Sequence, residues 1–182
     1  MKTFPHAYVC FLVEFHASRD YFECHELLEE YWKEHPGDPL SETWVGLIQL
    51  AVGLYHERRG NRRGALKMLM KAEAKLSAAP IDTIGLDKQR LLEQLARRTS
   101  QLSRDESLDG GFYTDLDLLI TSTELRSECE AECVKRGLDW GKPSRLEDAG
   151  VIHRHKLRDR SEVVAARQSA LADKKKERGG KA

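Results

Sequence analysis

A histidine and a glutamate stand one helical turn apart in a stretch that is apolar on one side. His25 lies within the apolar stripe of residues 21–32, and Glu29 follows it at the edge of the stripe. Side chains at positions i and i+4 of a helix can reach one point beside it. The pair therefore predicts either a buried structural hydrogen bond or part of a ligand-binding or catalytic cluster. The stripe itself consists of Tyr21, Cys24, His25, Leu28, Tyr31 and Trp32.

Polar residues elsewhere in the chain are expected to join this pair. Gln49 is the lone polar side chain in the apolar run 44–55, and a buried amide must find hydrogen-bond partners. His56 lies two turns further on the same side of that helix. We therefore expect His25, Glu29 and Gln49 to form one interior hydrogen-bonded cluster. The full candidate binding site consists of His25, Glu29, Gln49 and His56, with Arg19 and Arg59 supplying positive charge near its mouth.

Metal or acid–base chemistry at this cluster remains an alternative. His25 and Glu29 are weak candidates for metal ligands, because Glu29 stands where the zinc-peptidase pattern needs a second histidine. A catalytic zinc site also needs a third protein ligand. Cys24 is the one common nucleophile beside the cluster, and no cation near it in sequence lowers its pKa. No cofactor is predicted, and a metal is the alternative left open.

A second set of metal-ligating residue types occurs towards the C-terminus. Cys129 and Cys133 stand one helical turn apart, with His153 and His155 downstream. Their spacing matches no common zinc finger. Isolated thiols on a helix are the expected interpretation.

Prolines, glycines and capping residues divide the chain into helices that position these side chains. Asp20 and Glu23 form a capping box at the start of one helix, and Pro36 and Pro39 prevent that helix from continuing. We find no strand-like alternation with turn signals. The predicted fold is all-α, a helical bundle of antiparallel hairpins with a helical C-terminal extension. The expected helices span residues 1–17, 21–33, 41–59, 62–78, 87–102, 114–135 and 161–175.

One helix is expected to lie at the centre of the bundle. Residues 44–55 are apolar nearly all round, which is typical of a helix surrounded by others. The polar stretch 103–111 ends in two glycines and is the best linker candidate. The predicted domains are a helical core at 1–103, a helical extension at 104–173 and a disordered basic tail at 174–182.

A weak internal repeat runs through the first half of the chain. Phe15-His16-x-x-Arg19-Asp20 is echoed by Tyr55-His56-x-x-Arg59-Gly60. Two stacked hairpins of this kind predict a pair of tetratricopeptide-like units. Coincidence between two amphipathic hairpins is the alternative.

Composition excludes several classes of function. The 182 residues carry 30 Lys+Arg against 30 Asp+Glu, so net charge favours no specific nucleic-acid partner. The longest apolar run is well short of the roughly 20 residues of a membrane helix. Four cysteines without a signal peptide favour reduced thiols in the cytoplasm. We expect a soluble cytoplasmic protein with no membrane partner.

The motifs of residues 5–80 resemble those of a known family. Phe15-x5-Tyr21-Phe22-Glu23-x-His25-Glu26-x-Leu28-Glu29-x2-Trp32 is followed by Leu47-Ile48-Gln49-Leu50-Ala51, His56, Gly60-Asn61, Gly64-Ala65 and Lys71-Ala72-x3-Leu76. In this order they resemble the family called domain of unknown function 309. The resemblance implies an α-helical bundle and no activity. Cys24 stands where many relatives carry alanine, and nothing transfers to the region after Ser103.

Two functions compete on these grounds. The favoured one is a helical scaffold that binds a protein or peptide, because the chain shows hairpins and lacks a complete catalytic motif. The alternative is a metal-assisted or acid–base enzyme that works at His25 and Glu29. The oligomeric state is left open.

Overall fold

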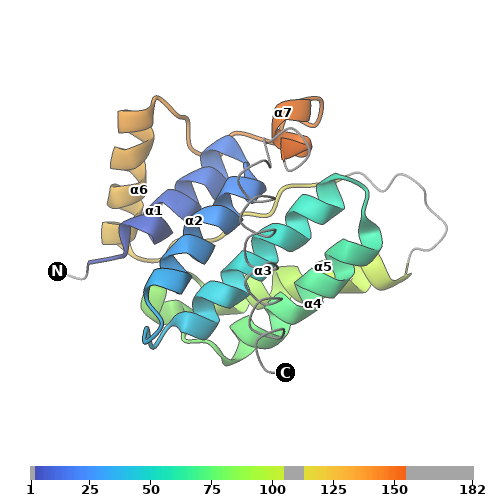
Figure 1. Cartoon of the computed structure of the whole chain (residues 1–182), viewed down its shortest axis with the longest axis horizontal. Helices are drawn as coiled ribbons and strands as arrows, with labels where there is room; N and C mark the ends of the chain where they lie inside the picture. The colour runs from blue at the N-terminus through green and yellow to red at the C-terminus, as the bar shows by residue number, and fades with distance from the viewer. Residues whose placement is uncertain (1–2, 105–112, 155–182) are drawn as a thin grey trace, which may run out of the picture. The chain divides into compact units, whose positions relative to one another are not determined.

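The computed structural model describes residues 3–104 and 113–154. Figure 1 shows α2, α3 and α4 as neighbouring antiparallel helices, and α1 packs against both α2 and α6. The all-α prediction is confirmed: this described part of the chain contains no strand, only an isolated β-bridge between Leu86 and Ile120. The helices are α1 His6–Val13, α2 Tyr21–Glu34, α3 Ser41–Arg58, α4 Arg62–Ala78, α5 Lys88–Arg104, α6 Thr123–Arg136 and α7 Ala149–Ile152, with a π-helical turn at Glu14–Ser18 and a 3₁₀ turn at Ile81–Ile84.

Two turns between helices share the same local structure, a residue with positive φ followed by a helix-capping residue. Arg19 and Gly60 both adopt positive φ, at 54° and 73°. The next residue in each case caps the following helix: the Asp20 carboxylate accepts a hydrogen bond from the Glu23 N–H, and Asn61 Oδ1 accepts one from Gly64. Because the chain reverses by the same route in both places, α1–α2 and α3–α4 form two similar hairpins.

The contact between α3 and α4 is close enough to need glycine. A Cβ atom at Gly46 would lie 2.7 Å from Leu76 Cδ2, and one at Gly53 would lie 2.6 Å from Leu69 Cδ2. Both leucines are fully buried. The two glycines stand two turns apart on α3, so they let α4 pack directly against the helix backbone.

The predicted all-round covering of α3 needs correction. Leu47 and Ala51 are fully buried in the core, as expected. Val45, Ile48 and Val52, however, are only half-buried. The helix has α2 and α4 on its flanks and the core beneath it, so one stripe of its surface remains partly accessible.

Residues 113–122 run as an extended segment across the core, where the sequence predicted the start of a helix at 114 or 115. Leu116, Leu118 and Ile120 are buried, while Asp117 and Leu119 between them are exposed. This alternation has the period of two residues of an extended chain. It covers only residues 116–120, which is too short a pattern to predict a strand from the sequence. The following helix, α6, begins only at Thr123, where the Ser122 hydroxyl accepts a hydrogen bond from Leu125 N–H.

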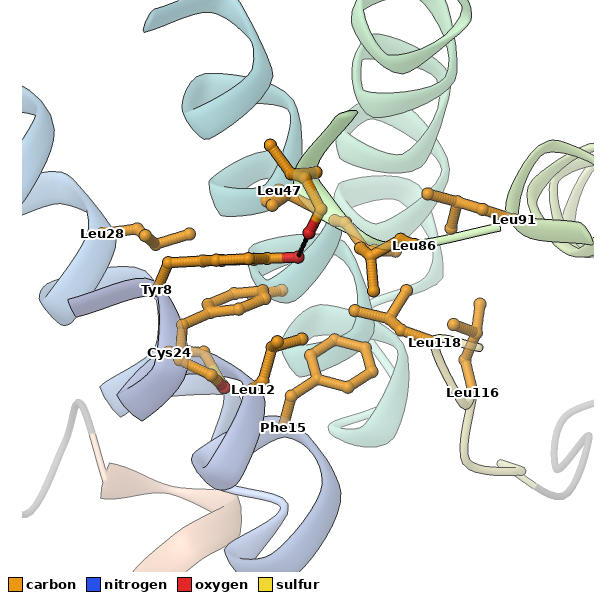
Figure 2. Close-up of a cluster of buried hydrophobic side chains, with 14 of the residues drawn as sticks. Tyr8, Leu12, Phe15, Cys24, Leu28, Leu47, Leu86, Leu91, Leu116 and Leu118 are labelled. Carbon is orange, nitrogen blue, oxygen red and sulfur yellow. Dashed lines mark hydrogen bonds between the residues drawn. The ribbon is translucent and has the colours of Figure 1, made fainter. Parts of the chain in front are cut away.

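The core therefore draws on residues from both sides of the predicted boundary at 103. Figure 2 shows Leu116 and Leu118 in one apolar cluster with Tyr8 and Phe15 of the N-terminal hairpin, and the Tyr8 hydroxyl donates to the Ile84 carbonyl at 3.1 Å. The described residues 3–104 and 113–152 belong to one compact unit. The extension predicted at 104–173 thus contributes Leu116 and Leu118 to this core, and its division from residues 1–103 as a domain stays a prediction.

Several predictions fall outside the described residues. The linker beyond residue 104, the helix at 161–175 and the basic tail at 174–182 belong to this part of the chain. In the part that the structure describes, no helix combines the length and apolar character needed to cross a membrane.

Candidate functional site

His25 and Glu29 pair as their spacing on α2 predicts. His25 Nε2 lies 3.1 Å from Glu29 Oε2, and Nδ1 lies 3.1 Å from the Phe22 carbonyl oxygen. Lys33 also contacts Glu29, at 2.9 Å. The hydrogen bond from Lys33 and the charge of nearby His25 together outweigh burial and lower the pKa of Glu29. The His25 side chain is 23% exposed, so the pair lies at the surface and not in the interior.

Gln49 and His56 do not join this pair. The Gln49 side-chain oxygen is buried without a hydrogen-bond partner. His56 Nδ1 instead accepts from the Asn61 side-chain amide at 3.0 Å, and burial together with nearby Arg59 lowers the pKa of His56. Gln49 therefore makes no hydrogen bond through its oxygen to His25 or Glu29 in this structure, and the role of these residues in a common site stays a prediction.

These residues nevertheless share one surface across two helices. Gln49, Val52 and His56 recur at helical spacing on α3, and the corresponding positions on α2 are half-buried too. The two helices are joined at both ends of this surface: the Phe22 ring lies 5.8 Å from the Tyr55 ring, and Trp32 Nε1 donates to Ser41 Oγ at 2.7 Å. We call this surface the α2–α3 face and define it by Phe22, His25, Glu29, Trp32, Gln49, Val52 and His56.

The two predicted arginines have different surroundings. Arg59 lies over the Tyr55 ring at 5.1 Å, at the C-terminal end of α3 beside the α2–α3 face. Arg19 is buried away from His25 and contacts the extended segment. Its guanidinium donates to Asp117 Oδ1 and to the carbonyl oxygen of Lys142, both at 2.8 Å. Arg19 therefore binds residues 117 and 142 to the turn that precedes α2, an arrangement that we call the anchor.

Arg58 and Asp115 complete this anchor, and no sequence pattern identifies either as a site residue. Arg58 donates to the Arg19 carbonyl oxygen at 2.6 Å and lies 4.7 Å over the Tyr21 ring. Asp115 accepts hydrogen bonds from Ser144 and from the Tyr21 hydroxyl. Burial raises the pKa of Asp115, but the hydrogen bonds from Ser144 outweigh burial and lower it. Sequence patterns do not reveal these contacts, which join residues dozens of positions apart.

A small hollow adjoins the anchor at His16. It has a volume of about 200 Å³ and is lined by His16, Asp117, Trp140 and two arginines, Arg90 and Arg126. The His16 ring is stacked on Trp140 with 4.4 Å between centroids, and Nδ1 lies 3.5 Å from Asp117 Oδ1. Burial lowers the pKa of His16, whereas the hydrogen bond from His16 and the adjacent Arg19 hold the pKa of Asp117 well below its usual range.

The predicted metal ligands do not form a complete set. Among the described residues, no third histidine, cysteine or carboxylate joins His25 and Glu29 within reach of one ion. Cys129 and Cys133 are buried in the apolar core, so their thiols pack as small apolar side chains. His155 lies outside the described residues.

Comparison with known proteins extends the similarity beyond the N-terminal motifs. A family model described as "Domain of unknown function (DUF309)" matches residues 8–68. "Uncharacterized protein YpuF" of Bacillus subtilis (strain 168) is 42% identical over 177 residues, which cover 96% of this chain and 99% of that protein. No solved structure matches the chain. The region after Ser103, for which the motifs implied nothing, thus has a counterpart in this relative.

Proposed function

The chain belongs to the family described as domain of unknown function (DUF309), and from its structure we propose that it is a binding scaffold for a protein or peptide, with the α2–α3 face as the docking surface. Several residues that carry the family resemblance lie on this face without being fully buried. They include His25, Trp32, Gln49 and His56. Half-exposed polar and aromatic side chains contribute less to the core than buried ones, so a role in recognition is the better account of them.

The unpartnered oxygen of Gln49 is the observation that carries the proposal. A buried acceptor without a hydrogen bond costs about 1–3 kcal/mol. Gln49 lies in the middle of the half-buried stripe of α3, flanked by Val45 and Val52. The oxygen is itself shielded from solvent, so the Gln49 side chain must turn outward to a new rotamer before a backbone or side-chain N–H of a partner can satisfy it. Aliphatic and aromatic neighbours would bury the surrounding apolar surface at the same time.

The charge of α2 favours a basic partner. Residues Tyr21–Glu34 include five glutamates and a single lysine. Electrostatic complementarity of this kind selects partners and speeds their encounter. Only Glu29 of these five belongs to the α2–α3 face, and the other four lie beside it on α2. We therefore propose a partner whose lysine or arginine side chains reach these neighbouring glutamates while it docks on the face.

We further propose that the two hairpins are tetratricopeptide-like. The support is that the turns at Arg19–Asp20 and Gly60–Asn61 share a positive φ followed by a capping side chain. Helical repeats of this class present extended surfaces to their partners. We also propose the cytoplasm as the site of action, on the basis of four cysteines that form no disulfide.

The enzyme alternative has less support. Both ring nitrogens of His25 have neighbours, and Glu29 is shared with Lys33. Cys24 is fully buried, and burial raises the pKa of its thiol well above the usual value. A reactive cysteine needs the opposite environment, one that is accessible and electropositive.

Site-specific photo-crosslinking in native cells tests the scaffold. A photoreactive residue at Val52 probes the α2–α3 face, and one at Met70, which is 56% exposed on α4, is the matched control. We expect a discrete adduct with another polypeptide from Val52 and none from Met70, with a yield that falls as salt is added. Equal adducts at both positions, or a cross-link from Val52 only within the chain itself, would reject the proposal.

A Gln49→Leu variant provides a second criterion. Removing the orphaned acceptor is expected to raise the free energy of unfolding by about 1 kcal/mol while abolishing the Val52 adduct. Stability gained at the expense of binding is the signature of a residue retained for function. If Gln49→Leu keeps the adduct at full yield, Gln49 has no part in docking.

A further inference from the structure

Three side chains of different types meet where α1 packs against α6, and none of them belongs to the α2–α3 face. His6 and Cys10 stand one turn apart on α1, and Glu132 reaches them from α6. His6 Nε2 lies 3.4 Å from Cys10 Sγ, and the ligand atoms of all three residues lie within 4.8 Å of one another. We propose that His6, Cys10 and Glu132 bind a zinc ion.

The separations suit a tetrahedral ion. Zinc binds nitrogen, oxygen and sulfur ligands at about 2.0–2.3 Å, which places neighbouring ligand atoms about 3.5 Å apart. The His6–Cys10 distance already has this value. Glu132 is half-buried on α6, and a change of its side-chain rotamer is the movement by which its carboxylate would approach the ion. Three protein ligands leave the fourth position of the ion for water.

The chemistry of the three donors selects the metal. An imidazole and a thiolate are preferred by zinc over magnesium or calcium, which take oxygen ligands. A Cys10 thiolate and a Glu132 carboxylate together balance the two charges of the ion. The exposed Lys135 ammonium lies 3.2 Å from Glu132 Oε2. A bound ion would take its place, and the lysine side chain can move into solvent.

Cys10 is also more accessible to an ion than the other three cysteines, which are buried. His6 is exposed, while Cys10 and Glu132 are half-buried, so an ion can enter from solvent and still be partly shielded. Arg136, the nearest guanidinium on α6, is held by Glu14. A bound ion would join the N-terminal helix to α6, and so fasten the C-terminal part of the compact unit to its first element.

Cobalt provides the test, because a cobalt–thiolate bond gives a charge-transfer absorption band. The full-length protein, stripped of metal with a chelator, is titrated with cobalt and then with zinc. We expect one equivalent of cobalt to produce the band and zinc to abolish it. Saturating zinc should also raise the melting temperature. No band with excess cobalt would overturn the proposal.

Matched variants locate the site. Cys10→Ser should abolish the band, and His6→Gln and Glu132→Gln should each weaken binding at least tenfold. Cys133→Ala and His35→Gln, which change one cysteine and one histidine outside the group, should leave binding intact. A band that persists in Cys10→Ser would overturn the proposal. If Cys10→Ser does not fold, His6→Gln is the deciding variant, because His6 is exposed and its replacement should leave the fold intact. Unchanged zinc affinity in His6→Gln would refute the site.

Discussion

Replacing Gly53 with alanine tests whether the close approach of α3 and α4 organises the bundle. The new methyl group would lie 2.6 Å from Leu69 Cδ2, 2.7 Å from Cγ and 3.3 Å from the Leu69 backbone nitrogen. Favourable carbon–carbon contacts need about 3.5–4.0 Å. Leu69 is fully buried, so it has no free space into which to turn. The two helices must therefore separate, or Leu69 must leave its preferred rotamer.

The expected magnitude follows from two opposing effects. Overpacking a core typically costs about 1–3 kcal/mol, and the backbone contact places Gly53 towards the upper end of that range. Alanine in a helix interior offsets this by about 0.8–1 kcal/mol relative to glycine. We expect Gly53→Ala to lower the free energy of unfolding by about 1–2 kcal/mol. Urea denaturation followed by far-ultraviolet circular dichroism measures this change.

Two further variants make this test specific. Gly37→Ala has no atom within 4 Å of the added Cβ, so its effect should stay within about 0.5 kcal/mol. Leu69→Ala alone should cost about 2–5 kcal/mol, but Gly53→Ala combined with it should cost less than the sum, by about 1–2 kcal/mol. Additive effects, or a Gly53→Ala protein as stable as the wild type, would show that the methyl group is accommodated without displacing Leu69.

Three other perturbations probe the anchor and the extended segment. Arg19→Ala should lower the free energy of unfolding by about 2–4 kcal/mol, because the buried carbonyl oxygens that accept from its guanidinium lose their donor. Arg59→Ala should cost less than about 1 kcal/mol, and equal urea midpoints for the two variants would contradict this. Burial lowers the pKa of His16, so below about pH 6.5 the unfolded state binds more protons and stability falls on acidification down to the folded pKa. Between about pH 7 and pH 5 the melting temperature of the wild type should fall further than that of His16→Gln. An equal decrease in both proteins would exclude His16 as the cause. Leu118→Ala should cost about 2–5 kcal/mol in one cooperative transition, whereas a separate second transition would mean that residues 113–152 unfold independently.

The anchor around Arg19 also explains an unusual backbone conformation. Arg19 is the only non-glycine residue of the described ranges with positive φ. Such a conformation costs of order 1 kcal/mol or more and persists when its surroundings determine it. Here the guanidinium contacts Asp117 and the Lys142 carbonyl oxygen, while Arg58 binds the Arg19 carbonyl oxygen. The turn is thus held in shape by the residues that it fastens to the core.

Local interactions let the sequence predict the helices and the contacts within them. Asp20 caps α2 and the Pro36–Pro39 region follows its end, because capping and proline geometry act over a few residues. His25 and Glu29 meet for the same reason, since their i, i+4 spacing is a property of a single helix. Leu47 and Ala51 were expected in the core from the apolar character of α3 and are buried there.

Only the tertiary structure decided how these helices turn towards one another. The exposure of His25 and the isolation of Gln49 depend on the rotation of α2 and α3 about their axes, which periodicity does not specify. Arg19 was assigned to the same cluster as His25, yet it is buried against residues about a hundred positions later in the chain. The segment at 114–120 is extended because the core and the anchor bind it, whereas its own sequence carries only a short alternation. His6 and Glu132 likewise come together only because α1 packs on α6, a contact that no local pattern encodes.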